Sequence, residues 1–235
     1  MIVGFVPARK GSKRIPRKNM KRLAGSPLII WTLEAAASAT LLDAIIVSSD
    51  DPELFELATL YTKVRKSWRD ADLAGDHVPD HPVVVDALSR MPDLWLKDED
   101  ILVMLRPTAP FRQPEEIDAV VQALQAQPTA DSVRSVRRIQ SSPQKMYLWS
   151  SHMLIPYTSD HRANHPGQDL DPVCYPTGFI DAVRYRAIKA GSMEGAVIKP
   201  WISPASRSVD LDTEEDWAEA ERLALAHHWG PGRIA

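Results

Sequence analysis

Short apolar runs alternate with stretches of helical periodicity along the first half of this 235-residue chain. The runs fall at residues 2–6, 44–47, 101–105 and 133–136. Runs of this length are typical of buried strands, and strands that alternate with helices form parallel sheets covered on both faces. The sequence therefore predicts an α/β fold with a mostly parallel sheet and helices on both of its faces.

The expected helices begin at recognisable caps. Residues 26–27 and 51–52 each pair a Ser or Asp N-cap with a proline at N1, which predicts helices over residues 27–37 and from residue 52. Thr213 and Asp216 form a capping-box-like pair, so another helix is expected from Thr213.

Two further helices are expected from the spacing of apolar residues. In residues 82–91, Val84, Val85 and Leu88 are predicted to share one buried face. From residue 114, apolar residues recur at i, i+3, i+4 and i+7, which predicts burial of Ile117, Val120, Val121 and Leu124.

The first apolar run is followed at once by a strongly basic loop, whose six cations are Arg9, Lys10, Lys13, Arg14, Arg17 and Lys18. Gly11 lets the backbone approach a ligand, and Ser12 offers a hydroxyl group. Ligands of parallel sheets bind beyond the carboxyl ends of the strands, and cations bind phosphate oxygens strongly, so this loop is predicted to bind a polyphosphate. It is neither a GxxxxGK[ST] P-loop nor a GxGxxG turn, and a solvated or nucleic-acid-binding patch is the alternative.

The composition narrows the classes of function. A net charge of −3 argues against general nucleic-acid binding, so the basic loop is interpreted as a local device. Cys174 is the only cysteine, which excludes an intramolecular disulfide and a cysteine-based zinc cluster. No apolar run approaches the ~20 residues of a membrane span, and the first run is expected to be a strand rather than a signal peptide. A cytoplasmic enzyme without membrane or nucleic-acid partners is expected.

Asp210 and Asp212 lie two residues apart, just before the helix expected from Thr213. In an extended segment such residues point to the same face. Paired carboxylates suit Mg²⁺ (or Mn²⁺), so a divalent-cation site is predicted here. The alternative is that Asp212 is only a neighbour of the helix cap.

Two histidine pairs have i, i+4 spacing, His77 with His81 and His161 with His165. Prolines lie close to both pairs, so neither pair is expected to sit on one helix. Surface or loop positions are the preferred interpretation.

Four blocks of the sequence, taken together, resemble a known enzyme family. The first is R-x-G-S-K-x-x-P-x-K-N at residues 9–19, and the others lie at residues 47–51, 105–112 and 208–214. In this order and spacing they are similar to the CMP-sialic acid synthetases (acylneuraminate cytidylyltransferases) over nearly the whole chain. The resemblance implies a Rossmann-like, GT-A-like nucleotidyltransferase fold. It also implies transfer of CMP from CTP to a nonulosonic (sialic-like) acid, with Mg²⁺ and release of pyrophosphate.

The resemblance also implies which residues act. Arg9, Lys18 and Asp212 are expected to be catalytic, and Asp210 with Asp212 matches the metal pair of the family. The expected nucleotide-binding residues are Arg9, Gly11, Ser12, Lys13, Lys18, Asn19, Arg69 and Asp80. A backbone-turn role is the alternative for Asn19, and for Asp80 the alternative is the N-cap of the helix at residue 82.

The acceptor side departs from the family pattern. Arg106 stands where the family has a glutamine, and Tyr175 and Thr177 stand where it has an arginine and an asparagine. Lys145 still matches a lysine that meets the acceptor carboxylate. A fixed cation at Arg106 favours an acceptor with more negative charge or a differently placed carboxylate or phosphonate, although neutral exchanges are equally compatible with the pattern.

The strand–helix pattern fails from about residue 140 to residue 177. In the resembled family this segment is a small β-rich arm that reaches across a dimer. A single domain over residues 1–235 is therefore expected, with a dimerisation arm at about 140–177 that closes the acceptor pocket of the partner in a homodimer.

Two other functions stay open. One is CMP transfer to another acid, either 3-deoxy-octulosonate or a phosphonate intermediate. The second is a non-catalytic nucleotide-binding protein on the same fold. No residue stands out as the general base, and either a metal-bound water or one of the aspartates could deprotonate the nucleophile.

Overall fold

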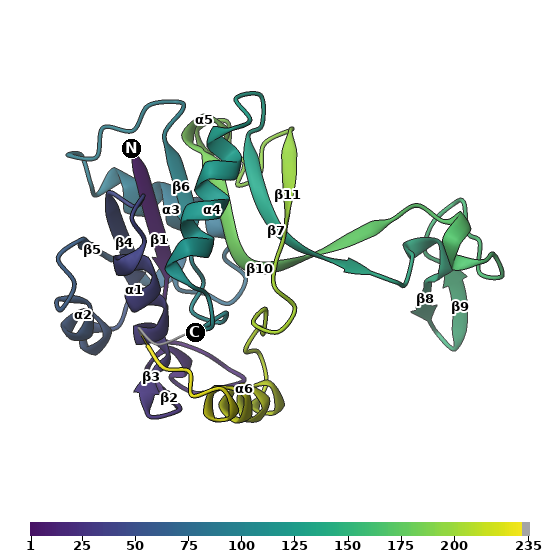
Figure 1. Cartoon of the computed structure of the whole chain (residues 1–235), viewed down its shortest axis with the longest axis horizontal. Helices are drawn as coiled ribbons and strands as arrows, with labels where there is room; N and C mark the ends of the chain where they lie inside the picture. Colours follow the sequence, from purple (N-terminus) through teal and green to yellow (C-terminus); the bar gives the residue numbers. More distant parts are fainter. Residues whose placement is uncertain (232–235) are drawn as a thin grey trace.

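The computed structural model describes residues 1–231, and residues 232–235 of the predicted domain lie outside the described residues. A central sheet occupies the middle of the molecule, and a slender arm extends from it (Figure 1). The strands of this sheet are β1 (Ile2–Pro7), β4 (Ala44–Ser49), β5 (Val64–Trp68), β6 (Ile101–Met104), β7 (Ser132–Ile139), β10 (Val173–Arg184) and β11 (Ile198–Ile202). They lie in the order β11-β7-β10-β6-β1-β4-β5, and β10 alone runs against the others, so the mostly parallel sheet is confirmed.

Helices cover both faces of the sheet, as predicted. The helices are α1 (Leu28–Ser38), α2 (Pro52–Ala58), α3 (Asp80–Ser89), α4 (Pro114–Gln125), α5 (Tyr185–Lys189) and α6 (Glu214–Ala226). Alternate residues of each strand point to opposite faces, so the sheet builds two separate cores. Ile45 and Val103 pack with α1, α2 and α4, whereas Ile46 and Met104 pack with α3 and α5.

A third core fastens the C-terminal helix beside the basic loop. Helix α6 packs through Trp217 against Trp31 at the start of α1 and against the hairpin of β2 (Arg22–Leu23) and β3 (Ser26–Pro27). Ile15 of the basic loop and Leu211 belong to the same cluster, and both are fully buried. This core therefore draws the segment that carries Asp210 and Asp212 toward the loop that follows β1.

Two expected helix starts are wrong. Helix α1 begins at Leu28 with Pro27 as its N-cap, and no side chain caps it, because Ser26 and Pro27 pair with β2 as a strand. Helix α3 begins at Asp80 rather than residue 82, and its buried residues are Val83, Val84 and Ala87, so Val85 lies outside the buried face. The N-cap of Asp51 on α2 and the capping box of Thr213 on α6 are confirmed.

The arm leaves the sheet as a continuation of β7 and β10 (Figure 1). Between them lie the 3-10 turns η3 (Pro143–Lys145) and η4 (Gly167–Asp169) and a hairpin of β8 (Tyr147–Ser150) and β9 (Met153–Pro156). Large apolar side chains of the hairpin face solvent, with Trp149 83% and Met153 67% exposed. The expected β-rich segment is therefore present, and its dimer role stays a prediction.

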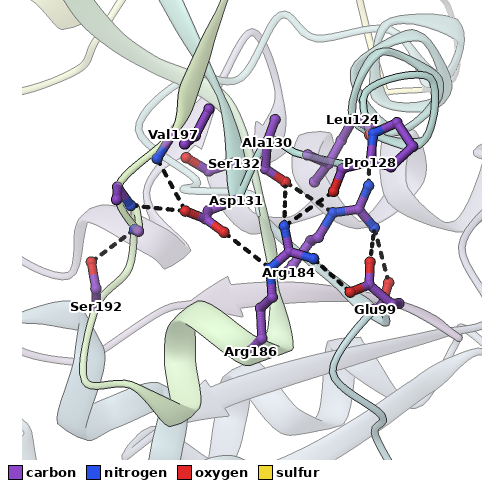
Figure 2. Close-up of polar contacts among 12 residues, drawn as sticks. Glu99, Leu124, Pro128, Ala130, Asp131, Ser132, Arg184, Arg186, Ser192 and Val197 are labelled. Carbon is purple, nitrogen blue, oxygen red and sulfur yellow. Dashed lines mark hydrogen bonds and ion pairs between the residues drawn. The ribbon is translucent and has the colours of Figure 1, made fainter.

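A network of Glu99, Asp131, Arg184 and Arg186, named here the amino-end network, closes the end of the sheet where β1 and β6 begin (Figure 2). The buried guanidinium of Arg184 donates to the carbonyl oxygens of Leu124 at 2.9 Å and Ala130 at 3.0 Å, and it pairs with Glu99 at 2.9 Å. The carbonyl oxygen of Leu124 also accepts the backbone N–H of Gln127 at 3.1 Å, so Arg184 adds a second donor at the C-terminal end of α4 and ties that end to β10.

Asp131 anchors the approach to the edge strand β11 within the same network. Its carboxylate accepts the backbone N–H groups of Ala196 at 2.9 Å and Val197 at 3.0 Å, and the Nε of Arg186 at 3.0 Å. These bonds, that of Val197 first, lower the pKa of Asp131. Gly195 has a φ of +72°, and a Cβ there would lie 2.3 Å from the Cβ of Asp131, so the turn needs glycine.

Among residues 1–231, no helix is long and apolar enough to cross a membrane.

Candidate active site

Three adjoining cavities lie at the carboxyl end of the parallel strands. The inner cleft, of about 290 Å³, is lined by residues that include Arg9, Gly11, Ser12, Lys18, Asn19, Arg69, Asp76, Asp80, Arg106 and Thr108. The loop recess, of about 400 Å³, is lined by Arg9, Ser12, Lys13, Arg14, Lys18, Asp76, His77 and Asp212. The arm-side cavity, of about 590 Å³, is lined by residues that include Arg106, Arg134, Arg137, Tyr175, Thr177, Ser208, Asp210 and Asp216. The inner cleft shares Arg9, Ser12, Lys18 and Asp76 with the loop recess and Arg106 with the arm-side cavity, so the three cavities are neighbours.

The basic loop is fastened to the sheet at several points. The backbone N–H of Lys10 donates to Asp50 at 2.6 Å, and the Nδ2 of Asn19 donates to the carbonyl oxygen of Arg9 at 2.9 Å. Arg17, in the left-handed region with a φ of 51°, pairs with Asp51 at 3.2 Å. Asn19 thus holds the backbone turn while it also lines the inner cleft, and its nucleotide contact stays a prediction.

Asp76 holds two cations of the basic loop. It pairs with Arg9 at 2.6 Å and Lys13 at 2.5 Å, and their hydrogen bonds, that of Lys13 first, lower the pKa of Asp76. The sequence analysis did not single out this aspartate. It lies 67 residues from Arg9 in the chain, and no spacing rule connects the two positions.

The predicted carboxylate pair flanks a buried residue, and its role as a metal site stays a prediction. Leu211 is fully buried, whereas Asp210 and Asp212 on either side of it are exposed. The Nζ of Lys18 donates to the carbonyl oxygen of Leu211 at 2.6 Å and approaches Asp212 at 3.4 Å, and Arg14 pairs with Asp212 at 3.1 Å. Lys18 and Asp212 therefore lie together in the loop recess, and Asp210, two residues earlier, lines the arm-side cavity.

The two carboxylates fit a hard divalent cation. The pKa of Asp210 is raised, chiefly because the surrounding protein keeps water from its carboxyl group and in part because Asp212 is close, while a hydrogen bond with Thr108 opposes the rise. A bound cation would relieve both costs. Within residues 1–231 no cluster of three or more His, Cys, Asp or Glu side chains forms a metal site, so a cation here would need further ligands from a substrate.

The histidine pairs do not form metal sites. His81 lies on α3 and contacts the carbonyl oxygen of Ile188 at 2.9 Å, whereas His77 precedes the helix. His161 lies in the arm against the ring of Tyr147, with 4.5 Å between ring centres. The interpretation of these residues as loop and packing histidines agrees with these contacts.

Arg69 lines the inner cleft from the end of β5. It is 5% exposed and donates from Nε to the Ser48 hydroxyl and from Nη2 to the Ser48 carbonyl oxygen, both at 3.1 Å. Burial lowers the pKa of this guanidinium. Its contact with a nucleotide stays a prediction.

Arg106 is not a free cation. Its guanidinium pairs with Asp80 at 2.6 Å and with Asp181 at 3.1 Å. The N-cap interpretation of Asp80 is wrong, because Asp80 lies in the first turn of α3 and turns toward Arg106. The two carboxylates compensate the positive charge of Arg106, so this charge no longer favours a more anionic acceptor.

Arg112 fixes the loop that carries Arg106. It is fully buried and donates to the carbonyl oxygens of Arg106 at 2.7 Å and Phe179 at 3.0 Å, and to the Thr32 hydroxyl at 3.0 Å. The loop after β6 is therefore tied to α1 and to β10.

Tyr175 and Thr177 come together with Arg106 in the arm-side cavity, but Lys145 does not. Thr177 lies in a bulge of β10, where the register passes from Pro176 opposite Val136 to Asp181 opposite Arg134. Lys145 lies at η3 in the arm, and it lines none of the three cavities.

Comparison with known proteins places these features in a family. The cytidylyltransferase family matches residues 3–148. The CMP-N,N'-diacetyllegionaminic acid synthase of Legionella pneumophila is 32% identical, covering 94% of this chain and 95% of its own, and the pseudaminic acid cytidylyltransferase of Campylobacter jejuni is 26% identical, covering 95% and 96%. A solved CMP:2-keto-3-deoxy-manno-octonic acid synthetase in complex with CTP superposes with a TM-score of 0.70 at 18% identity, covering 97% of this chain and 99% of the other. At 18% identity, the likeness to this synthetase shows that the two chains share a fold.

Proposed function

The chain belongs to the cytidylyltransferase family, and we propose that it transfers CMP from CTP to a nonulosonic (sialic-like) acid with release of pyrophosphate. One observation carries the proposal. Asp212 lines the basic loop recess, and Asp210, two residues earlier, lines the arm-side cavity. The two carboxylates therefore sit between a basic recess that suits a triphosphate and a separate cavity that suits an acceptor.

The nucleotide half uses the basic loop and the inner cleft. Cations of the loop neutralise the triphosphate, and Arg9 and Lys13 exchange Asp76 for phosphate oxygens. Gly11 and Ser12 lie in the same loop and line the inner cleft. The base and ribose occupy the inner cleft near Arg69, Asn19 and Asp80. Lys18, held by the carbonyl oxygen of Leu211, stabilises charge that develops at the reacting phosphate.

Asp210 and Asp212 would hold Mg²⁺, or Mn²⁺, together with phosphate oxygens. When bound, the cation supplies Lewis-acid stabilisation of phosphate charge. The acceptor enters the arm-side cavity, where Arg106, Tyr175 and Thr177 face it, and its hydroxyl attacks the α-phosphate while pyrophosphate leaves.

A homodimer would complete the site. The exposed apolar hairpin of the arm, with Trp149 and Met153 most open, has the character of a subunit contact. Lys145 would then meet the acceptor carboxylate in the partner's site, since it lines no cavity in its own subunit.

Mixing of two inactive variants tests this arrangement. Lys145→Ala removes the arm lysine, and Asp212→Asn removes a metal ligand. If Lys145 acts across the dimer, mixed dimers contain one intact site, so mixing the two variants with exchange of subunits restores turnover. If Lys145 acts within its own chain, no site is intact and mixing restores nothing.

The test of the proposed function is pyrophosphate release from CTP and Mg²⁺ with a panel of acids. N-acetylneuraminate, legionaminate and pseudaminate represent nonulosonic acids, and octulosonate and small phosphonates represent the alternative acceptors. Turnover with a nonulosonic acid is expected. Turnover only with octulosonate or a phosphonate would overturn the acceptor class, and CTP binding without turnover on any acid would favour a non-catalytic protein.

A further inference from the structure

Two of the arginines that line the arm-side cavity are already engaged. Arg106 pairs with Asp80 and Asp181. Arg134 pairs with Asp181 at 3.4 Å and with Glu194. To bind an anionic ligand with its full charge, either arginine would first have to give up a carboxylate partner.

Arg137 differs from both. It lines the same cavity and is exposed, and its guanidinium has no hydrogen bond or ion pair with any described residue of the chain. Its guanidinium lies over the ring of Tyr175, 5.4 Å from the ring centre. Tyr175 is its cross-strand partner in β10, so the paired strands β7 and β10 set this stack.

A second observation points to a polar ligand at the same place. The hydroxyl oxygen of Thr177, two residues after Tyr175, is buried and without a hydrogen-bond partner among residues 1–231. Thr177 belongs to the bulge of β10 and lines the arm-side cavity. A buried hydroxyl normally has a partner, so a group that the chain lacks is expected beside it.

We propose that Arg137, supported by the ring of Tyr175 and aided by the Thr177 hydroxyl, binds the carboxylate of the acceptor acid. This inference rests on the proposed function and names a specificity-determining residue within it. A guanidinium binds a carboxylate with two parallel hydrogen bonds, and a ring face beneath it fixes its plane. The contact belongs to the acceptor alone, since Arg137 lines neither the inner cleft nor the loop recess.

The experiment compares Arg137→Gln with Arg138→Gln in steady-state pyrophosphate release. Arg138 is the matched control, because it is the next residue of β7, is also exposed, and lines none of the three cavities. Arg137→Gln is expected to raise the KM for the acid by roughly 10- to 100-fold and to leave the KM for CTP unchanged. Arg138→Gln is expected to change neither constant by more than about twofold.

A carboxylate-blocked acceptor sharpens the assignment. The wild-type protein should discriminate strongly between the acid and its methyl ester, and Arg137→Gln should discriminate less, with the remainder due to Lys145. An unchanged KM for the acid in Arg137→Gln, or discrimination against the ester as strong as in the wild-type protein, would overturn the proposal. Failure of the proposed function is distinguishable, because then the wild-type protein itself releases no pyrophosphate with any nonulosonic acid.

Discussion

The two ends of the central sheet both carry clusters of charged side chains, but the clusters are built differently. In the amino-end network, Arg184 is buried and four carbonyl oxygens and Glu99 surround its guanidinium. At the carboxyl end, Lys13 is 80% exposed while it pairs with Asp76, and Arg137 has no ionic partner in the described chain. At the amino end, the buried guanidinium has its acceptors within the chain. At the carboxyl end, an ion pair is exposed to solvent and one arginine has no ionic partner among the described residues.

The difference separates stability from function. Buried polar groups stabilise a fold when every partner is present, and they are costly when one is removed. Exposed ion pairs contribute little to folding and are exchanged readily for a ligand. The amino-end network is therefore expected to hold the molecule together, and the carboxyl end is expected to bind and react.

The largest effect is expected from Asp212→Asn, which alters the carboxyl end alone. Loss of a metal ligand should reduce kcat by about 10³-fold. The melting temperature should change little, because the carboxylate is exposed. Pyrophosphate release and thermal unfolding measure the two properties, with Glu215→Gln, an exposed glutamate of α6, as the control. If Asp212→Asn lost stability in proportion to activity, the carboxyl end would also stabilise the fold, and the proposed difference between the two ends would be wrong.

The next largest effect is expected from Arg184→Leu in the amino-end network, which should lower stability and leave activity intact. Loss of the buried guanidinium removes its hydrogen bonds to the carbonyl oxygens of Leu124 and Ala130 and its ion pair with Glu99, and should cost about 3 kcal/mol of unfolding free energy. The melting temperature should fall by roughly 10 °C, while kcat of the folded protein at low temperature is retained. Arg222→Leu, which removes an exposed pair with Glu219, is the control and should cost less than about 0.5 kcal/mol. Equal losses in the two variants would contradict the prediction.

A smaller effect is expected in the pH dependence of the unfolding free energy, through Asp131. The pKa of Asp131 is lower in the folded protein than in the unfolded chain, so its contribution is complete above the unfolded-state value of ~4 and is lost as pH falls below it. Urea unfolding should show the wild-type protein about 1–2 kcal/mol more stable than Asp131→Asn at pH 7, with the gap closing toward pH 3. A gap that stays constant between these pH values would show that the charge of Asp131 is immaterial.

The smallest effect concerns Asp76, which occupies two cations in the absence of nucleotide. Asp76→Asn frees Arg9 and Lys13 for phosphate, so the KM for CTP should stay the same or fall by about two- to fivefold. Titration with CTP and steady-state kinetics measure this change. A rise of tenfold or more would show that Asp76 positions the basic loop rather than competing with the triphosphate.

The sequence predicted the sheet well where its strands are buried. The runs at β1, β4 and β6 are apolar because helices cover both of their faces, and Val133 of β7 packs in the core that contains α4. Strand β5 was not predicted, because it lies at the sheet edge and only Ser67 in its segment is buried. Periodicity reports burial, so an edge strand with polar residues gives no such signal.

The site could be predicted only in part. The basic loop and the pair Asp210 and Asp212 lie in short, recognisable blocks, and the structure brings them together. The partners that neutralise Arg106 could not be found in this way, since Asp181 lies 75 residues away and reaches it through the antiparallel pairing of β10 with β6. Charge compensation depends on the tertiary fold, which explains why Arg106 was interpreted as a free cation.

The bulge of β10 also bears on how enzymes of this shape can change substrate. Four residues, Thr177 to Ile180, are accommodated opposite Ser135, and the Ser135 hydroxyl accepts the N–H of Ile180 at 3.0 Å. Exchanges at Thr177 and Gly178 alter the wall of the arm-side cavity, while the basic loop is carried by another element. The choice of acid can therefore drift during evolution, or be redesigned in the laboratory, without rebuilding the machinery that handles CTP.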